Sequence, residues 1–194
     1  MTDKDLKKYK SLNEIAEKGG IVIFGGSDDK NIPLCELKQA FSLNSDVYNR
    51  SVTNLSVNNA LEIYSKCIAE LYPETVLLHI GDADLKLYKD NPSDFEQKYC
   101  NLINRIKTDN KKCDVAVVSL KNYKNNADIT MLNKSLKNIA DSEHCDYCDV
   151  SAKRVWNPKQ TKDIISFVYD IGFVRPLRKK RPVSDMVRTL FCWE

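Results

Sequence analysis

Short, almost continuously apolar runs recur along the chain and constrain its fold more than any other feature. Three of them occupy residues 21–25, 75–80 and 114–119 and are rich in valine, isoleucine and leucine. Runs of this kind are typical of parallel strands, because helices cover both faces of a parallel sheet. Two weaker runs, at about 46–50 and 146–150, bring the predicted strands to five.

Amphipathic helical patterns separate the apolar runs. Apolar side chains recur every three or four residues in the segments 3–18, 56–71, 93–108, 128–142 and 160–170. Strands and helices that alternate at this rhythm favour an α/β fold with a parallel sheet and right-handed crossovers. We therefore predict a three-layer α/β/α domain with a five-stranded parallel sheet.

Composition excludes several broad classes of protein. The chain has 194 residues, of which 42% are hydrophobic and 29% charged, as in an ordinary globular protein. No apolar run approaches the roughly 18 residues that a membrane span requires. The N-terminal residues are polar where a secretion signal needs an apolar core, so we expect a cytoplasmic protein with reduced thiols. The pair Cys145 and Cys148 lacks a second pair at zinc-ligand spacing, and neither a metal nor a cofactor is predicted.

The C-terminal twenty residues differ from the rest of the chain in charge. Residues 175–194 carry six basic and two acidic side chains, a net charge of +4, whereas the whole chain carries +3. We predict an α/β domain over residues 1–174, followed by a basic connector and an amphipathic helix. Because the domain itself is almost neutral, nucleic acid is not an expected partner. The apolar stripe of the last helix packs on its own domain or forms a homodimer through Leu190, Phe191 and Trp193.

The carboxyl ends of parallel strands are where function concentrates in open α/β sheets. The first predicted strand ends in Gly25-Gly26-Ser27-Asp28, and the third is followed by Gly81-Asp82-Ala83-Asp84. Glycines permit a tight turn that can present a serine at the rim of the sheet. Taken alone, this serine signals either a nucleophile or a simple turn.

Together, the strand-end loops resemble the SGNH, or GDSL, hydrolase superfamily. That family reads F-G-D-S after strand one, N-x-G near strand two, G-x-N-D after strand three and D-x-x-H-P before the last helix. The corresponding stretches here are 24–27, 49–51, 81–84 and 154–158, in the same order. The resemblance extends over residues 21 to about 170. It implies a flavodoxin-like strand order 2-1-3-4-5 and the ester hydrolysis of GDSL lipases and esterases.

Most of the catalytic positions implied by this resemblance have changed. Ser27 occupies the nucleophile position, but Asn157 stands where the family has its base histidine and Arg154 where an aspartate orients that histidine. An asparagine amide cannot accept the serine proton, without which the hydroxyl is a weak nucleophile. Ala83 replaces an oxyanion-binding asparagine, and loss of one such donor costs about 10²–10³ in rate. Ser51 replaces an oxyanion glycine but keeps its backbone N–H, so this change is expected to be the mildest.

The resemblance also assigns the residues around the nucleophile. The ancestral pocket is predicted to include Gly26, Asp28, Ser51, Ala83, Asp84, Arg154 and Asn157. Asp84 is expected to tie loops together, because the family aspartate at this position commonly does so. His79 is expected to be a packed core histidine, and Asp28 and Asp29 are expected to cap the next helix or face water.

Three functions are consistent with these residues. The first is an SGNH-like binding or regulatory pseudoenzyme with impaired or absent ester hydrolysis, whose ligand is a small molecule or acyl ester. The second is an active acyl-ester hydrolase that uses Ser27 with an atypical base, such as a nearby aspartate. The third is a Mg²⁺-dependent phosphoryl-transfer enzyme that uses Asp82 and Asp84.

Overall fold

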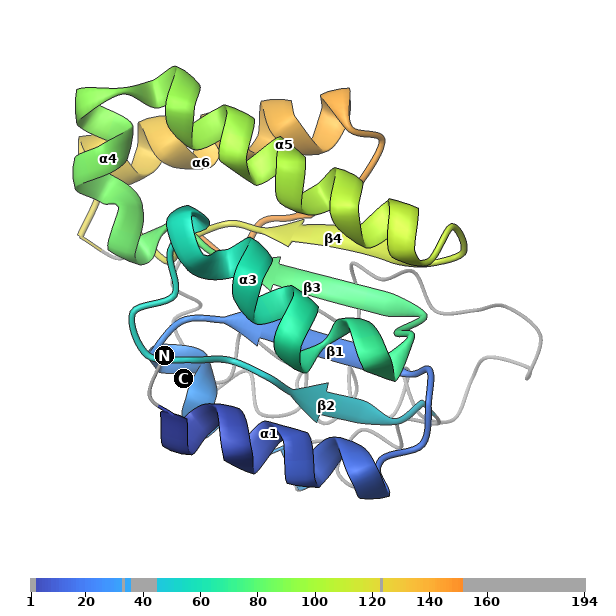
Figure 1. Ribbon diagram of the computed structural model, residues 1–194. Coiled ribbons are helices and arrows are strands. Elements are labelled where there is room, and N and C mark those ends of the chain that lie inside the picture. The colour runs from blue at the N-terminus through green and yellow to red at the C-terminus, as the bar shows by residue number, and fades with distance from the viewer. Residues whose placement is uncertain (1–2, 33, 36–44, 123, 152–194) are drawn as a thin grey trace, which may run out of the picture.

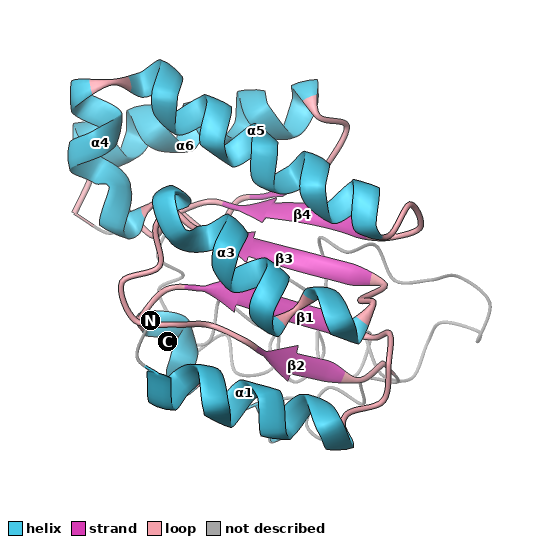
Figure 2. Ribbon diagram, viewed as in Figure 1, coloured by secondary structure: helices cyan, strands magenta, loops and turns pink. Residues whose placement is uncertain are grey.

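A computed structural model describes residues 3–32, 34–35, 45–122 and 124–151 and confirms the predicted parallel sheet with flanking helices (Figures 1 and 2). Its strand order is β2-β1-β3-β4-β5, the 2-1-3-4-5 order that the resemblance implies. The strands are β1 (Ile21–Gly25), β2 (Val47–Asn49), β3 (Thr75–His79), β4 (Asp114–Val118) and β5 (Asp146–Cys148). The described helices are α1 (Asp3–Ile15), α3 (Val57–Cys67), α4 (Leu85–Asp90), α5 (Pro92–Asp109) and α6 (Ala127–Ser142). Short 3-10 turns are η1 (Asp28–Asn31), η2 (Ala69–Leu71) and η3 (Asp82–Asp84).

The predicted helices differ from the observed ones mainly at their ends. The pattern over 56–71 is divided into α3 and η2 by Ile68, whose backbone leaves the helical conformation. Helix α4 was not predicted, because its six residues are too few to show a clear apolar period. The predicted helix over 160–170 and the predicted C-terminal appendage, 175–194, lie outside the described residues.

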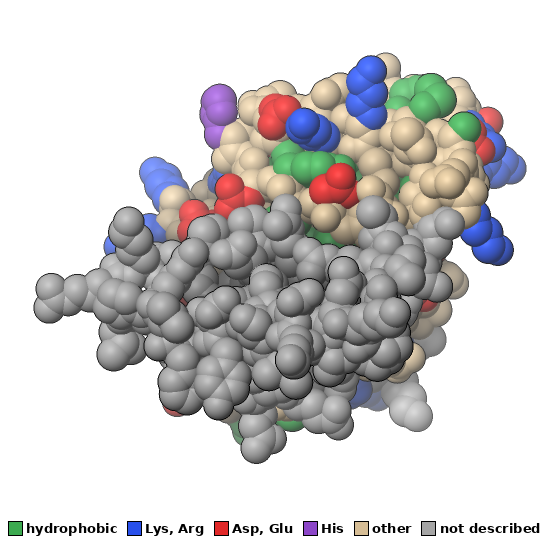
Figure 3. All heavy atoms as spheres, turned by 180° about the vertical axis from the view of Figure 1, so that it is seen from behind, with side chains coloured by type: hydrophobic (Ala, Val, Ile, Leu, Met, Phe, Trp, Pro, Cys, Tyr) green, Lys and Arg blue, Asp and Glu red, His purple; other side chains and the backbone are tan. Residues whose placement is uncertain are grey.

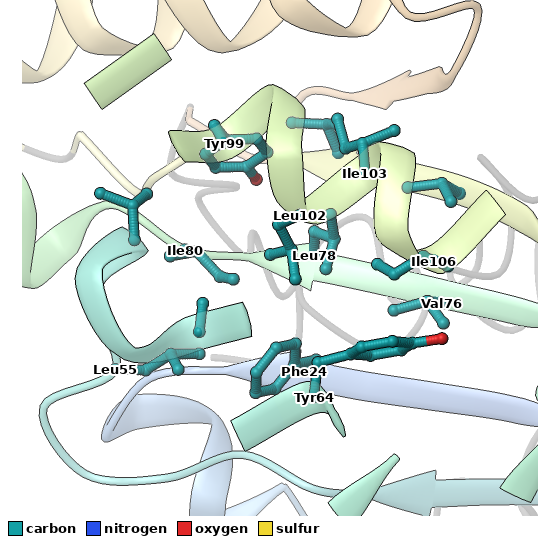
Figure 4. Close-up of a cluster of buried hydrophobic side chains, with 14 of the residues drawn as sticks. Phe24, Leu55, Tyr64, Val76, Leu78, Ile80, Tyr99, Leu102, Ile103 and Ile106 are labelled. Carbon is teal, nitrogen blue, oxygen red and sulfur yellow. The ribbon is translucent and has the colours of Figure 1, made fainter. Parts of the chain in front are cut away.

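Side chains alternate between the two faces of the sheet and so divide the core. One face carries Phe24, Val76 and Leu78, which pack with side chains of α3 and α5 in a large buried cluster (Figure 4). The other face carries a smaller cluster that includes Ile23 and Leu77. This period of two explains why the apolar runs are nearly continuous, since both faces are buried. Strand β3 pairs with β1 in register, so that His79 lies opposite Gly25 at the carboxyl end.

Helix α1 lies beside β2 at one edge of the sheet (Figure 1). Arg50, immediately after β2, is buried, and its guanidinium lies 5.3 Å from the ring centre of Tyr9 and 5.6 Å from that of Tyr48. Its Nε and Nη2 donate hydrogen bonds to Asn13 Oδ1 at 2.9 and 2.6 Å. The hydroxyl of Tyr9 donates to the carbonyl of Ser51. These contacts attach α1 to the segment that follows β2, the strand at one end of the sheet order.

The described surface seen from behind carries acidic and basic side chains close to one another (Figure 3). Among the described residues, no helix combines the length and the apolar character needed to cross a membrane. Cys145 and Cys148, the close pair noted in the sequence, are not joined by a disulfide.

Candidate functional site

Ser27 lies just beyond the carboxyl end of β1, as predicted. Its backbone is α-helical (φ −61°, ψ −39°), its side chain is exposed, and the turn η1 follows directly. Within the described ranges, neither histidine nitrogen is hydrogen-bonded to the Ser27 hydroxyl, and no acceptor binds the Ser27 N–H. Gly26 is half-buried and Asp28 is exposed beside it. The serine is therefore presented to solvent without a base among the residues described.

Asp29 does not face water or cap a helix, and that expectation was wrong. Its carboxylate is buried and lies against His79 at the end of β3, with Nδ1 at 2.8 Å from Oδ2 and 3.0 Å from Oδ1. Because a carboxylate only accepts hydrogen bonds, Nδ1 of His79 carries the hydrogen. The same Oδ2 accepts the N–H of Gly26 at 3.1 Å. His79 is buried, as expected, but it has a polar partner that the sequence did not suggest.

Ser51 stands where the resemblance places an oxyanion glycine, and its N–H is already occupied. That N–H donates to Asn49 Oδ1 at 2.9 Å, within the same N-x-S stretch. The Ser51 hydroxyl accepts the N–H of Gly25 at 3.1 Å and is fully buried. The backbone N–H that remains at position 51 is thus directed at a neighbouring side chain in this structure, and the added hydroxyl is bound to Gly25. Sequence spacing could not show this bond, which depends on the side-chain rotamer of Asn49.

Asp84 joins two loops, as expected. Its buried carboxylate accepts the N–H of Val57, the first residue of α3, at 3.1 Å (Oδ2) and 3.3 Å (Oδ1). Burial raises the pKa of Asp84 to about 6, while the Val57 hydrogen bond and the charge of Lys98 oppose this shift. Asp82 and Ala83, its neighbours in η3, are exposed.

The carboxylates of the third loop do not converge with those of the first. Asp84 is committed to α3, Asp29 to His79, and Asp82 is exposed. Across the described parts of the chain, no three His, Cys, Asp or Glu side chains come together as a metal site would require. This geometry does not favour the magnesium-dependent alternative.

Several predicted site residues lie beyond the described ranges. Arg154 and Asn157, which occupy the positions of the family aspartate and histidine, fall there, as do Leu190, Phe191 and Trp193 of the predicted dimer contact. The described part of the site therefore consists of Gly26, Ser27, Asp28 and the ends of β2 and β3. The residue at the position of the family base, Asn157, is known from the sequence alone.

Comparison with known proteins finds similar structures but no matching sequence family. No protein-family model and no curated protein matches the chain. Among solved structures, it is similar to a GDSL-like lipase from Bacteroides thetaiotaomicron, with 17% identity, a TM-score of 0.60 and coverage of 86% of this chain and 92% of that one. It is also similar to a catalytic mutant of an acetylxylan esterase from Geobacillus stearothermophilus, with 14% identity, a TM-score of 0.55 and coverage of 86% and 99%. The chain therefore has the SGNH-hydrolase fold that the strand-end motifs predicted.

Proposed function

We propose that this chain is an SGNH-fold binding protein whose capacity for serine ester hydrolysis is impaired or absent. The ligand would be a small molecule, with an acyl ester as the first class to test, and would lie at the carboxyl ends of β1 and β3 beside Ser27. The esterases and lipases that share the fold support this class of ligand.

The hydrogen bond from the Ser51 N–H to Asn49 Oδ1, at 2.9 Å, is the observation that carries the proposal. Stabilisation of an oxyanion requires donors aimed at the position where negative charge develops. Ala83 offers no side-chain donor, and Ser51 directs its N–H elsewhere, so the Ser27 N–H is the only one of the three family donors still available. With Asn157 in the base position, both halves of the hydrolytic apparatus are weakened.

An active hydrolase with an atypical base is the main alternative. A nearby aspartate would have to fill that role, but Asp29 is buried against His79, and Asp84 is buried against the start of α3. Asp28 remains exposed next to Ser27. No described hydrogen bond joins its carboxylate to the Ser27 hydroxyl, so the contacts among the described residues do not place it as the base.

Hydrolysis of a short-chain nitrophenyl ester by the full chain and by Ser27→Ala tests the proposal. We expect the two proteins to hydrolyse the ester at the same low rate. Turnover by the full chain that disappears in Ser27→Ala would replace the proposal with the alternative. A thermal-shift comparison with non-hydrolysable acyl amides then tests binding separately from chemistry.

A further inference from the structure

His79 and Asp29 form a buried polar pair for which the proposed function has no use. They come from elements far apart in the sequence, the end of β3 and the turn η1, and only 9% and 3% of their surface is exposed. Burial of such groups is costly unless they are hydrogen-bonded to one another. The contact between Nδ1 and the carboxylate, at 2.8 and 3.0 Å, supplies this partner.

The pair is connected directly to the turn that carries Ser27. Asp29 Oδ2, which accepts from His79, also accepts the N–H of Gly26, the residue before Ser27. On the other side, the Asp29 carbonyl accepts the Asn49 side-chain amide at 2.6 Å. The ends of β1, β2 and β3 are thus joined through one aspartate.

Gly26 has open space where a side chain would lie. A Cβ placed on Gly26 would meet no atom within 4 Å, so side-chain packing at this position does not fix the turn. Gly25 shows the opposite situation, because a Cβ there would lie 1.8 Å from Asp29 Oδ2. The carboxylate therefore occupies the space that the glycine leaves open, and its hydrogen bond to Gly26 adds to the bonds that Gly25 makes with Ser51 and Val52.

We propose that His79 and Asp29 are positioning residues that fix the Ser27 turn against the end of β3. His79 holds the carboxylate in one orientation, and the carboxylate holds the Gly26 N–H. Ser27 is consequently presented in a single backbone conformation. The proposal concerns the geometry of the turn and holds whether or not Ser27 reacts with an ester, so an ester assay cannot decide it.

Amide hydrogen exchange of the full chain, followed by NMR, tests the proposal. His79→Leu removes the partner that orients the Asp29 carboxylate, and the weakened Gly26 hydrogen bond should increase exchange of the Gly26 amide by about ten- to a hundredfold. His79→Asn should exchange like the unmodified protein, because its amide nitrogen is separated from the backbone by the same number of bonds as Nδ1. Exchange at Leu77, in the middle of β3, reports changes in global stability.

Two further variants keep the test decisive. Thr75→Val changes a buried polar residue at the other end of β3 and should leave Gly26 exchange unaltered relative to Leu77. Asp29→Asn, which weakens both bonds of the carboxylate, should reproduce the effect of His79→Leu and replaces it if that variant does not fold. Unchanged Gly26 exchange in His79→Leu or Asp29→Asn, or an equal rise in Thr75→Val, would overturn the assignment.

Discussion

Replacement of Asp84 by asparagine should change how the stability of the protein depends on pH. In the folded chain, burial raises the pKa of this carboxyl to about 6, from an ordinary value of 3.8. Because the folded state then binds a proton more tightly than the unfolded state, stability is greatest below pH 3.8 and is lost as pH rises through 6. The full loss corresponds to about 3 kcal/mol, of which about 2.5 kcal/mol falls between pH 4 and pH 8.

Asparagine keeps an oxygen that can accept the Val57 N–H but does not titrate. The free energy of unfolding of Asp84→Asn, minus that of the unmodified protein, should therefore increase by about 2.5 kcal/mol from pH 4 to pH 8. A constant offset, from the added amide hydrogens in a buried position, does not affect this difference. Urea unfolding followed by circular dichroism at several pH values measures it. Asp90→Asn, an exposed change at the end of α4 that is not among the charges acting on Asp84, is the control for the general effect of removing a carboxylate.

The reasoning can fail in a specific way. Two effects oppose each other at Asp84, since burial raises its pKa while the hydrogen bond from Val57 and the charge of Lys98 lower it. A difference that stays constant across the pH range would show that these effects cancel. A difference that decreases with rising pH would show that the hydrogen bond outweighs burial, and the carboxylate would then stabilise the loop in its ionised form.

Further predictions concern the turn and the N-terminal helix. Gly25→Ala should destabilise the protein by about 1–3 kcal/mol, because the new Cβ would lie 1.8 Å from Asp29 Oδ2. Gly26→Ala should be close to neutral, because its Cβ would meet no atom within 4 Å. Equal urea midpoints for the two variants would contradict this prediction. Arg50→Lys should lower the free energy of unfolding in urea by about 1–3 kcal/mol, because a lysine cannot reproduce the paired bonds to Asn13 or the stacking of the guanidinium. An unchanged free energy of unfolding would show that these contacts contribute little.

Much of the fold could be predicted because it depends on patterns that lie along the chain. Apolar runs at 21–25, 75–80 and 114–119 predicted the central strands, and the resemblance supplied their order. The structural role of Asp84 was predicted from the resemblance, because the family aspartate at this position commonly ties loops together.

The rest of the site depends on contacts between elements, which spacing does not report. Asp29 reaches His79 only because η1 turns back over the end of β1 and because β1 and β3 pair in register. The bond between Asn49 and the Ser51 N–H depends on one side-chain rotamer. One feature of the sequence did hint at the contact. Gly25 lacks a side chain at the end of β1, next to His79 at the end of β3, and this leaves space for the side chain of another residue.

Reaction of the full chain with a fluorophosphonate probe tests the central claim most directly. The probe reports whether Ser27 is an activated nucleophile, independently of any substrate preference. With no base for Ser27 among the described residues, with Asn157 at the family base position and with the Ser51 N–H engaged, Ser27 should be labelled no faster than the background seen in Ser27→Ala. Stoichiometric labelling at Ser27, located by peptide mass spectrometry and absent from Ser27→Ala, would show that the hydrolytic apparatus is intact.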